Sequence, residues 1–186
     1  MRAFIASPLS QEFHAELVLL QRRLDKPGNT IRWLKPNNIH LTLKFLRSIN
    51  DKQLKKIVPL LTTILKSHKS FAINLSGVGF FPNIHYPRVI WIGVKKGKKE
   101  CERLQNDIED SLACQEIEKN KKPFSPHFTI GRIKYKDNKP APVSLIKNGN
   151  NYRLEATALV KRIVLFQSIL TPKGPIYKEA EKFQLH

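Results

Sequence analysis

The tetrapeptide His40-Leu41-Thr42-Leu43 recurs later in the chain as His127-Phe128-Thr129-Ile130. Each copy alternates a polar with an apolar side chain, which is the period of a β-strand buried on one face. In such a strand the histidine and threonine share one face, while the apolar residues, extending to Phe45 in the first copy, point into a core. Each copy therefore predicts a rigid strand that presents one imidazole and one hydroxyl together.

The two copies are separated by nearly half of the 186 residues, which suggests a duplicated unit with pseudo-twofold symmetry. Helical and strand periodicities alternate around both copies, and no linker rich in Pro, Gly or Ser divides the chain. We therefore predict one bilobal domain over residues 1–186, of class α+β, with two pseudo-symmetric lobes of antiparallel sheet and outer helices around a central groove. Strands are expected at 2–7, 31–34, 39–46, 71–81, 88–94, 127–134 and 152–170. Helices are expected from Ser10, as N-cap, to Leu24, at 51–66, at 98–118 and near Val143. Within the second helix Pro59 marks an irregularity or a late start.

The charge of the chain is strongly unbalanced, with 33 Lys and Arg against 15 Asp and Glu and a net charge of +18. A polyanion is the natural partner of such a surface, and counterion release would make it bind nucleic acid with little sequence preference. The alternative is a solvated basic surface without a partner. The lysine clusters at 95–99 and 119–122 lie in expected turns and fit either interpretation.

Several classes of protein are disfavoured by the sequence. No window approaches the roughly 20 consecutive apolar residues of a membrane span, and the first residues read directly into a strand, so we expect a cytoplasmic protein without membrane contact. Neither a glycine-rich phosphate loop nor a set of zinc ligands is present, and Cys101 and Cys114 have no CxxC spacing. We therefore expect no cofactor and no metal.

Two imidazoles and two hydroxyls that face each other across a cleft suit the handling of a phosphate group. Histidine has an unperturbed pKa near 6.5, so one imidazole can accept a proton while the other donates one. Arg132 is the candidate cation for the phosphate oxygens. Strict alternation places it on the wrong face, but Gly131 predicts a bulge that shifts the alternation; otherwise Arg132 is a surface residue at a strand end. The remaining histidines lack a threonine two positions on and are assigned no role: His14, His68, His85 and His186.

The chain resembles the two-histidine (2H) phosphoesterases, and within them the RNA 2′,3′-cyclic phosphodiesterases, historically called 2′-5′ RNA ligases. The resemblance extends over almost the full length and depends on the order and spacing of several phrases. One departure is Arg47-Ser48, beyond the catalytic face, where the family commonly has glycine and an acidic residue. The matching phrases are RAFIAS, IRW at 31–33, HLTLKFL, FPNIHYPRVIWIGV, PFSPHFTIGRI and SILTPKGPIYKEAEKF.

The resemblance implies metal-independent hydrolysis of RNA 2′,3′-cyclic phosphate ends to 2′-phosphomonoesters, with reversible 2′-5′ ligation as an associated reaction. It assigns His40 as proton donor and His127 as proton acceptor, with the roles exchanged in the reverse direction. Thr42, Thr129 and Arg132 would bind the phosphate. Phe4 and Tyr177 are candidates for contact with the base or ribose, although core packing is favoured for Phe4.

The expected partner is RNA with 2′,3′-cyclic phosphate ends, including tRNA fragments, and the protein is expected to be a monomer. Two other functions stay open at this point. One is a non-catalytic RNA-binding module that retains the groove. The other is a 2H enzyme that acts on 2′-5′ oligonucleotides or small cyclic nucleotides.

Overall fold

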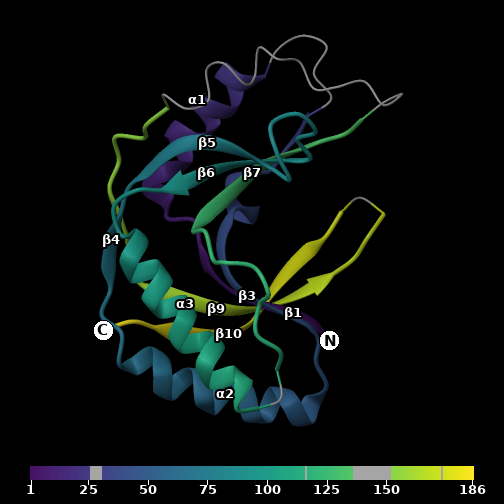
Figure 1. Ribbon diagram of the computed structural model, residues 1–186, viewed down its shortest axis with the longest axis vertical. Coiled ribbons are helices and arrows are strands. Elements are labelled where there is room, and N and C mark those ends of the chain that lie inside the picture. The colour runs from purple at the N-terminus through teal and green to yellow at the C-terminus, as the bar shows by residue number, and fades with distance from the viewer. Residues whose placement is uncertain (26–30, 116, 136–151, 173) are drawn as a thin grey trace.

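The computed structural model describes residues 1–25, 31–115, 117–135, 152–172 and 174–186. Within these residues eight strands form one bent antiparallel sheet, whose two ends diverge while helices cover its outside (Figure 1). Seven strands follow in the order β10 (Ile176–Gln184), β9 (Arg162–Ile169), β1 (Arg2–Pro8), β3 (His40–Ser48), β7 (His127–Ile133), β6 (Val89–Val94) and β5 (Leu75–Phe81), and β2 (Ile31–Trp33) also pairs with β7. β4 (Phe71–Ile73) and β8 (Ala158–Val160) form a separate pair.

The sheet consists of two lobes that meet at β3 and β7. We call β10, β9, β1 and β3 the first lobe, and β7, β6, β5 and β2 the second lobe. Between β3 and β7 the register contains one pair, Leu41 with Phe128. The predicted α+β class with two lobes is confirmed, but the lobes do not coincide with the halves of the chain, because the first lobe combines strands from both ends of the sequence.

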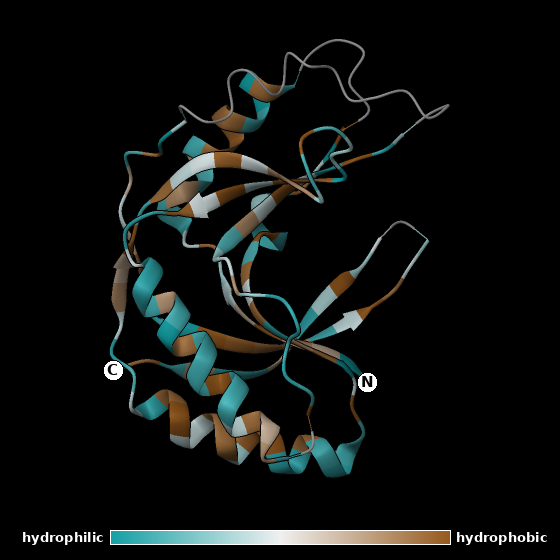
Figure 2. Ribbon diagram, viewed as in Figure 1, coloured by the Kyte–Doolittle hydropathy of each residue, from teal (hydrophilic) through white to brown (hydrophobic). Residues whose placement is uncertain are grey.

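Three α-helices of the described chain pack outside the lobes. α1 (His14–Leu24) covers the second lobe, and α2 (Asp51–Lys66) and α3 (Lys98–Ala113) cover the first, where they also contact each other (Figure 1). Figure 2 shows apolar residues recurring along α2 and α3. Their spacing of three to four residues places them on one face of each helix, which buries them in the main core: Ile57, Leu61 and Leu65 in α2, and Leu104, Ile108 and Leu112 in α3.

Helix ends differ in part from the predictions. α2 begins as predicted, since the Asn50 and Gln53 side chains and backbone N–H groups form a reciprocal capping box. Pro59 lies inside α2, so the predicted late start is wrong. The side chain of Ser10 does not cap the first helix, because its hydroxyl donates to the Glu12 carboxylate and a 3₁₀ turn (Gln11–Phe13) precedes α1. α3 ends at Ala113, short of the predicted 118.

Strand predictions failed where strands change sheets. The predicted strand at 71–81 is interrupted at Asn74, whose side-chain amide donates to the Ala156 carbonyl and the Thr157 hydroxyl. The predicted strand at 152–170 is likewise divided between β8 and β9, and β10 was not predicted at all. The helix expected near Val143 lies outside the described residues.

A bulge in β3 reverses the expected orientation of two side chains. The register with β1 shifts between Ile5 and Ala6, which leaves Leu43 without a partner. Phe45 therefore faces away from the main core and is 63% exposed, so its predicted core position is wrong. Lys44 points inward instead and is 1% exposed.

The buried ammonium of Lys44 connects three parts of the structure. It donates to Glu109 Oε2 of α3 at 2.6 Å and to the Glu118 carbonyl at 2.5 Å. Glu109 also accepts hydrogen bonds from Gln105 Nε2 at 3.0 Å and from the Asn120 backbone N–H at 3.2 Å. This buried ion pair therefore attaches β3 both to α3 and to the segment that leads into β7.

We predict that Lys44→Met lowers the free energy of unfolding by about 3–5 kcal/mol, because it leaves the Glu109 carboxylate buried without its cation. Urea unfolding followed by circular dichroism measures the loss. Lys98→Met is the matched control, because Lys98 forms an exposed pair with Glu102 at 3.7 Å and should cost less than about 0.5 kcal/mol. Equal losses in the two variants would contradict the prediction.

Candidate active site

Both histidine–threonine pairs lie at the junction of the lobes, on the face of the sheet opposite Leu41 and Phe128. We call this face the groove face. Leu41 and Phe128 pair across this junction and are 0% and 1% exposed in the main core. Since neighbouring residues of a strand point to opposite faces, the histidine and threonine of each motif lie on the other face. All four are half-buried there: His40 and Thr42 on β3, and His127 and Thr129 on β7.

The two histidines are oriented by the same local hydrogen bond. In each, Nδ1 contacts the backbone carbonyl two residues earlier, at 3.0 Å from Asn38 for His40 and at 2.6 Å from Ser125 for His127. A carbonyl oxygen only accepts hydrogen bonds, so Nδ1 carries the hydrogen. Each Nε2 is then the ring nitrogen that remains to accept or donate a proton.

Aromatic rings surround both imidazoles. The His40 ring lies 4.8 Å from Phe4 and 5.2 Å from Tyr177, measured between ring centroids. The His127 ring lies 5.0 Å from Phe81 and 5.8 Å from Trp91. These contacts remove water from the imidazoles, which disfavours their charged forms.

The pKa values of both histidines are lowered, chiefly by burial. Burial, together with the positive charges of Arg132 and His127, lowers the pKa of His40 to about 4, although the Asn38 carbonyl opposes the shift. Burial also lowers the pKa of His127 from its usual value, against the effect of the Ser125 carbonyl. Both imidazoles are therefore neutral near pH 7 in the free protein.

Arg132 lies on the same face as Thr129 because β7 contains a bulge. Trp91 pairs with Thr129 and Ile90 with Gly131, so Ile130 has no partner in β6. The bulge returns Arg132 to the groove face, where its positive charge lowers the pKa of His40. Gly131 itself is required by a close contact, since an added Cβ would lie 2.8 Å from the Trp33 ring.

Comparison with known proteins agrees with this geometry. The family model described as LigT-like phosphoesterase matches the chain twice, over residues 8–91 and 92–177, and each match contains one histidine–threonine motif. The chain belongs to the LigT-like phosphoesterases. The resemblance inferred from the motifs is confirmed.

Relatives and solved structures match this LigT-like phosphoesterase over almost its full length. A Methanothermobacter thermautotrophicus protein named RNA 2′,3′-cyclic phosphodiesterase is 31% identical over 188 residues, covering 100% of the chain and 99% of the relative. One of the same name from Archaeoglobus fulgidus is 33% identical, covering 99% and 100%. The crystal structure of a Thermus thermophilus protein has a TM-score of 0.83 at 29% identity, covering 100% and 98%. E. coli LigT complexed with 3′-AMP shares the fold, with a TM-score of 0.76 at 22% identity, covering 99% and 97%.

In this LigT-like phosphoesterase the bulge of β7 is supported by Gln21 of α1. Its side-chain amide donates to the Ile130 carbonyl at 2.9 Å and to the Leu34 carbonyl at 2.8 Å, and the Leu34 N–H donates to Ile130 at 3.0 Å. Gln21 is 8% exposed. The sequence held one signal of this role, a glutamine on the helix face that Leu17, Leu20 and Leu24 bury.

The aromatic residues of the site differ in their access to the groove. Phe4 is 3% exposed and stacks on Phe166, with 5.1 Å between ring centroids. It therefore packs between Phe166 and the His40 ring rather than being open to the groove. Tyr177 packs against the same cluster and stays partly exposed. Phe45, which was expected in the core, is cross-strand to Phe4 and presents an exposed ring on the groove face.

The described residues contain no group of three or more His, Cys, Asp and Glu side chains placed to hold a metal ion. Among their helices, none combines the length and apolar character needed to cross a membrane.

An NMR titration of the imidazole Cε1–H signals tests the pKa values. We predict that His40 protonates near pH 4 and His127 below 6.5, because burial disfavours imidazolium in the folded protein. The same protein in denaturant provides the reference. Inorganic phosphate should raise both midpoints, because an anion in the groove favours imidazolium. A His40 midpoint at or above 6.5 in the free protein would contradict the buried, proton-free imidazole.

The support of the bulge is tested by Gln21→Leu. We predict that this variant lowers the free energy of unfolding by about 1–2 kcal/mol, because the buried Ile130 and Leu34 carbonyls each lose a donor. Amide hydrogen exchange should also become faster at Leu34. Gln11→Leu, in the exposed turn before the same helix, is the matched control and should change neither quantity. Unchanged exchange at Leu34 would show that Gln21 does not support the bulge.

Proposed function

We propose that this protein hydrolyses 2′,3′-cyclic phosphates at RNA ends to 2′-phosphomonoesters, with its two histidines as acid and base and without a metal. The observation that carries the proposal is the pair of imidazoles on adjacent strands, each with Nδ1 occupied by a backbone carbonyl and Nε2 left for the groove. The names of the relatives from Methanothermobacter and Archaeoglobus support the choice of substrate.

The reaction needs one proton removed and one supplied. His127 Nε2 would take a proton from water as its oxygen bonds to phosphorus, and His40 Nε2 would give a proton to O3′ as the P–O3′ bond breaks. The phosphate then remains on O2′. In-line displacement requires the two groups on opposite sides of phosphorus, which suits histidines from the two lobes. In 2′-5′ ligation an RNA 5′-hydroxyl would replace water as the nucleophile, with the same roles for the two histidines. The roles exchange in the reverse of ligation, when O3′ attacks phosphorus and the P–O5′ bond breaks.

The lowered pKa values make substrate binding part of the mechanism. In the free protein the pKa of His40 is about 4, which by itself favours the neutral form rather than a proton donor. A bound phosphodiester anion would offset the charge of Arg132 and stabilise an imidazolium, so protonation of the donor follows substrate binding. The assignment of His40 as donor comes from the family resemblance, and the two histidines titrate as a coupled pair.

The remaining site residues would hold the substrate. The hydroxyls of Thr42 and Thr129 and the guanidinium of Arg132 lie on the groove face and would bind the non-bridging phosphate oxygens. Tyr177 and Phe45 would contact the base or ribose, with Phe4 behind them. The proposal extends to tRNA fragments as substrates, to a monomeric enzyme and to a cytoplasmic location.

The first experiment is hydrolysis, in the presence of EDTA, of an RNA oligomer that ends in a 2′,3′-cyclic phosphate. We predict a 2′-phosphate product, and a fall in kcat/KM of about 10²- to 10⁴-fold in both His40→Ala and His127→Ala, since each loses one proton transfer. The position of the phosphate is read by NMR or by phosphatase sensitivity. His186→Ala, an exposed histidine at the C-terminus, is the control and should retain wild-type activity.

The other functions are distinguished by the same experiment. Unchanged turnover in a folded His127→Ala variant would overturn the mechanism. Tight, salt-sensitive RNA binding without any product would indicate a binding module. Turnover confined to 2′-5′ oligonucleotides or to small cyclic nucleotides would retain the chemistry but replace the substrate.

A further inference from the structure

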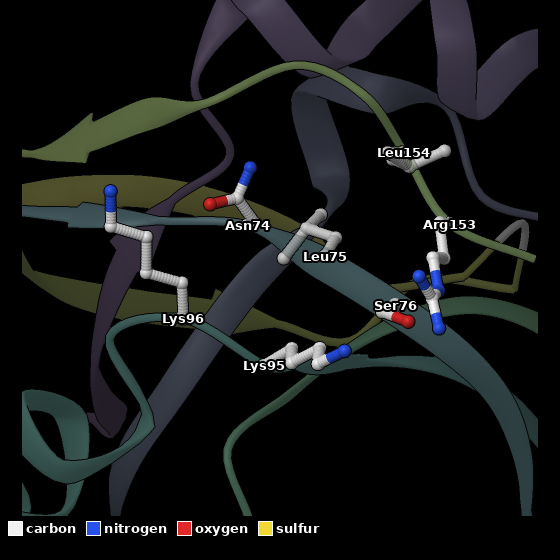
Figure 3. A pocket seen from close by; sticks show the side chains of 7 residues that line it. All are labelled: Asn74, Leu75, Ser76, Lys95, Lys96, Arg153 and Leu154. Carbon is white, nitrogen blue, oxygen red and sulfur yellow. The ribbon is translucent and has the colours of Figure 1, made fainter.

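The second lobe carries a basic pocket that the catalytic residues do not use. Its cavity of about 450 Å³ is open to solvent and lies at the start of β5, the end of β6 and the segment before β8. Figure 3 shows the side chains of Lys95 and Arg153 directed toward Ser76 from two sides. The lining residues are Asn74, Leu75, Ser76, Lys95, Lys96, Arg153 and Leu154.

The pocket lies on the same face of the sheet as the histidines. His127 pairs with Gly93, Gly93 with Ser76, and Ser76 with Arg153. Directly opposed residues of antiparallel strands point to the same face, so these positions form one row across the groove face. Three strand spacings separate the ends of the row, a distance of about 14 Å.

The two positions between His127 and Arg153 carry the smallest side chains of the row. Gly93 has no side chain, and Ser76 contributes only a hydroxymethyl group. A Cβ added at Gly93 would lie 3.1 Å from the Ser76 carbonyl and 3.4 Å from the ring of Trp91, which lies on this face beside His127. An RNA backbone that ran along this row would therefore meet only these small side chains and the Trp91 ring between His127 and the pocket.

The charge of the pocket is suited to an anion. Lys95, Lys96 and Arg153 are exposed, and no carboxylate is among the lining residues. None of the three forms any of the ion pairs found within the described part of the chain. Because the pocket is about 14 Å from His127, the phosphate it would hold is not the reacting one but one farther along the strand.

We infer that Lys95 and Arg153 bind a backbone phosphodiester a few nucleotides upstream of the cyclic end, so that the enzyme prefers RNA oligomers to cyclic mononucleotides. This inference rests on the proposed function. Cations that follow the backbone bind single strands without reading their sequence, which suits an enzyme that must accept many RNA ends. The lysine run at 95–99 gave no such assignment in the sequence, because Arg153 joins it only in the fold.

The test is the double variant Lys95→Gln with Arg153→Gln. The ratio of kcat/KM on a cyclic-ended oligomer to kcat/KM on a cyclic mononucleotide should fall about tenfold. The slope of log Kd against log salt for the oligomer should fall by about 1.4, since each phosphate contact in a single strand contributes about 0.7. The control, Lys52→Gln with Lys55→Gln, removes two positive charges from the exposed surface of α2. It should change the kcat/KM ratio and the salt slope much less than the double variant does.

The outcomes separate this inference from the proposed function. A wild-type ratio and a wild-type salt slope in the double variant would overturn the inference, as would equal changes in the control. If the wild-type protein opens neither substrate, the proposed function fails. The salt slope, measured by fluorescence anisotropy with a labelled oligomer, then decides the pocket's role without any turnover.

Discussion

The contact between Leu41 and Phe128 is the constraint on which the site depends. Both side chains enter the main core, and together they form the register between the two motif strands. Burial of this apolar pair fixes the opposite faces of both strands toward the groove. Both histidines thus lie on the same face of the sheet because the side chains next to them are buried in the core, and the arrangement of the candidate site follows from the packing of the core.

Two single-residue bulges then direct one cationic side chain into the core and another toward the groove. The unpaired Leu43 turns Lys44 inward toward Glu109, and the unpaired Ile130 turns Arg132 toward His40. Both bulges are stabilised from the outer helices, by a carboxylate of α3 in the first lobe and by an amide of α1 in the second. The outer helices therefore stabilise the local backbone shape that directs Lys44 inward and Arg132 toward the groove.

Local patterns were sufficient for much of the fold and for the two motifs. Alternation identified the motif strands, and the apolar stripe between Leu54 and Leu65 identified α2, because each pattern reports burial within one element. The inward turn of Lys44 and the exposure of Phe45 could not be predicted, since nothing local marks Leu43 as a bulge. Gly131 did mark the second bulge. β10 escaped prediction because most of its side chains are exposed, so that no apolar alternation remains in its sequence.

The strand order has a consequence for synthesis of the protein. Strand β1 lies between β3 and β9, and the rings beside His40 include Phe166 and Tyr177 near the C-terminus. A nascent chain that has already emerged past both motifs still lacks the strands that enclose His40. The two imidazoles consequently acquire their aromatic neighbours at different times on the ribosome, because the rings beside His127 precede it in the chain while those of Phe166 and Tyr177 are made after both motifs.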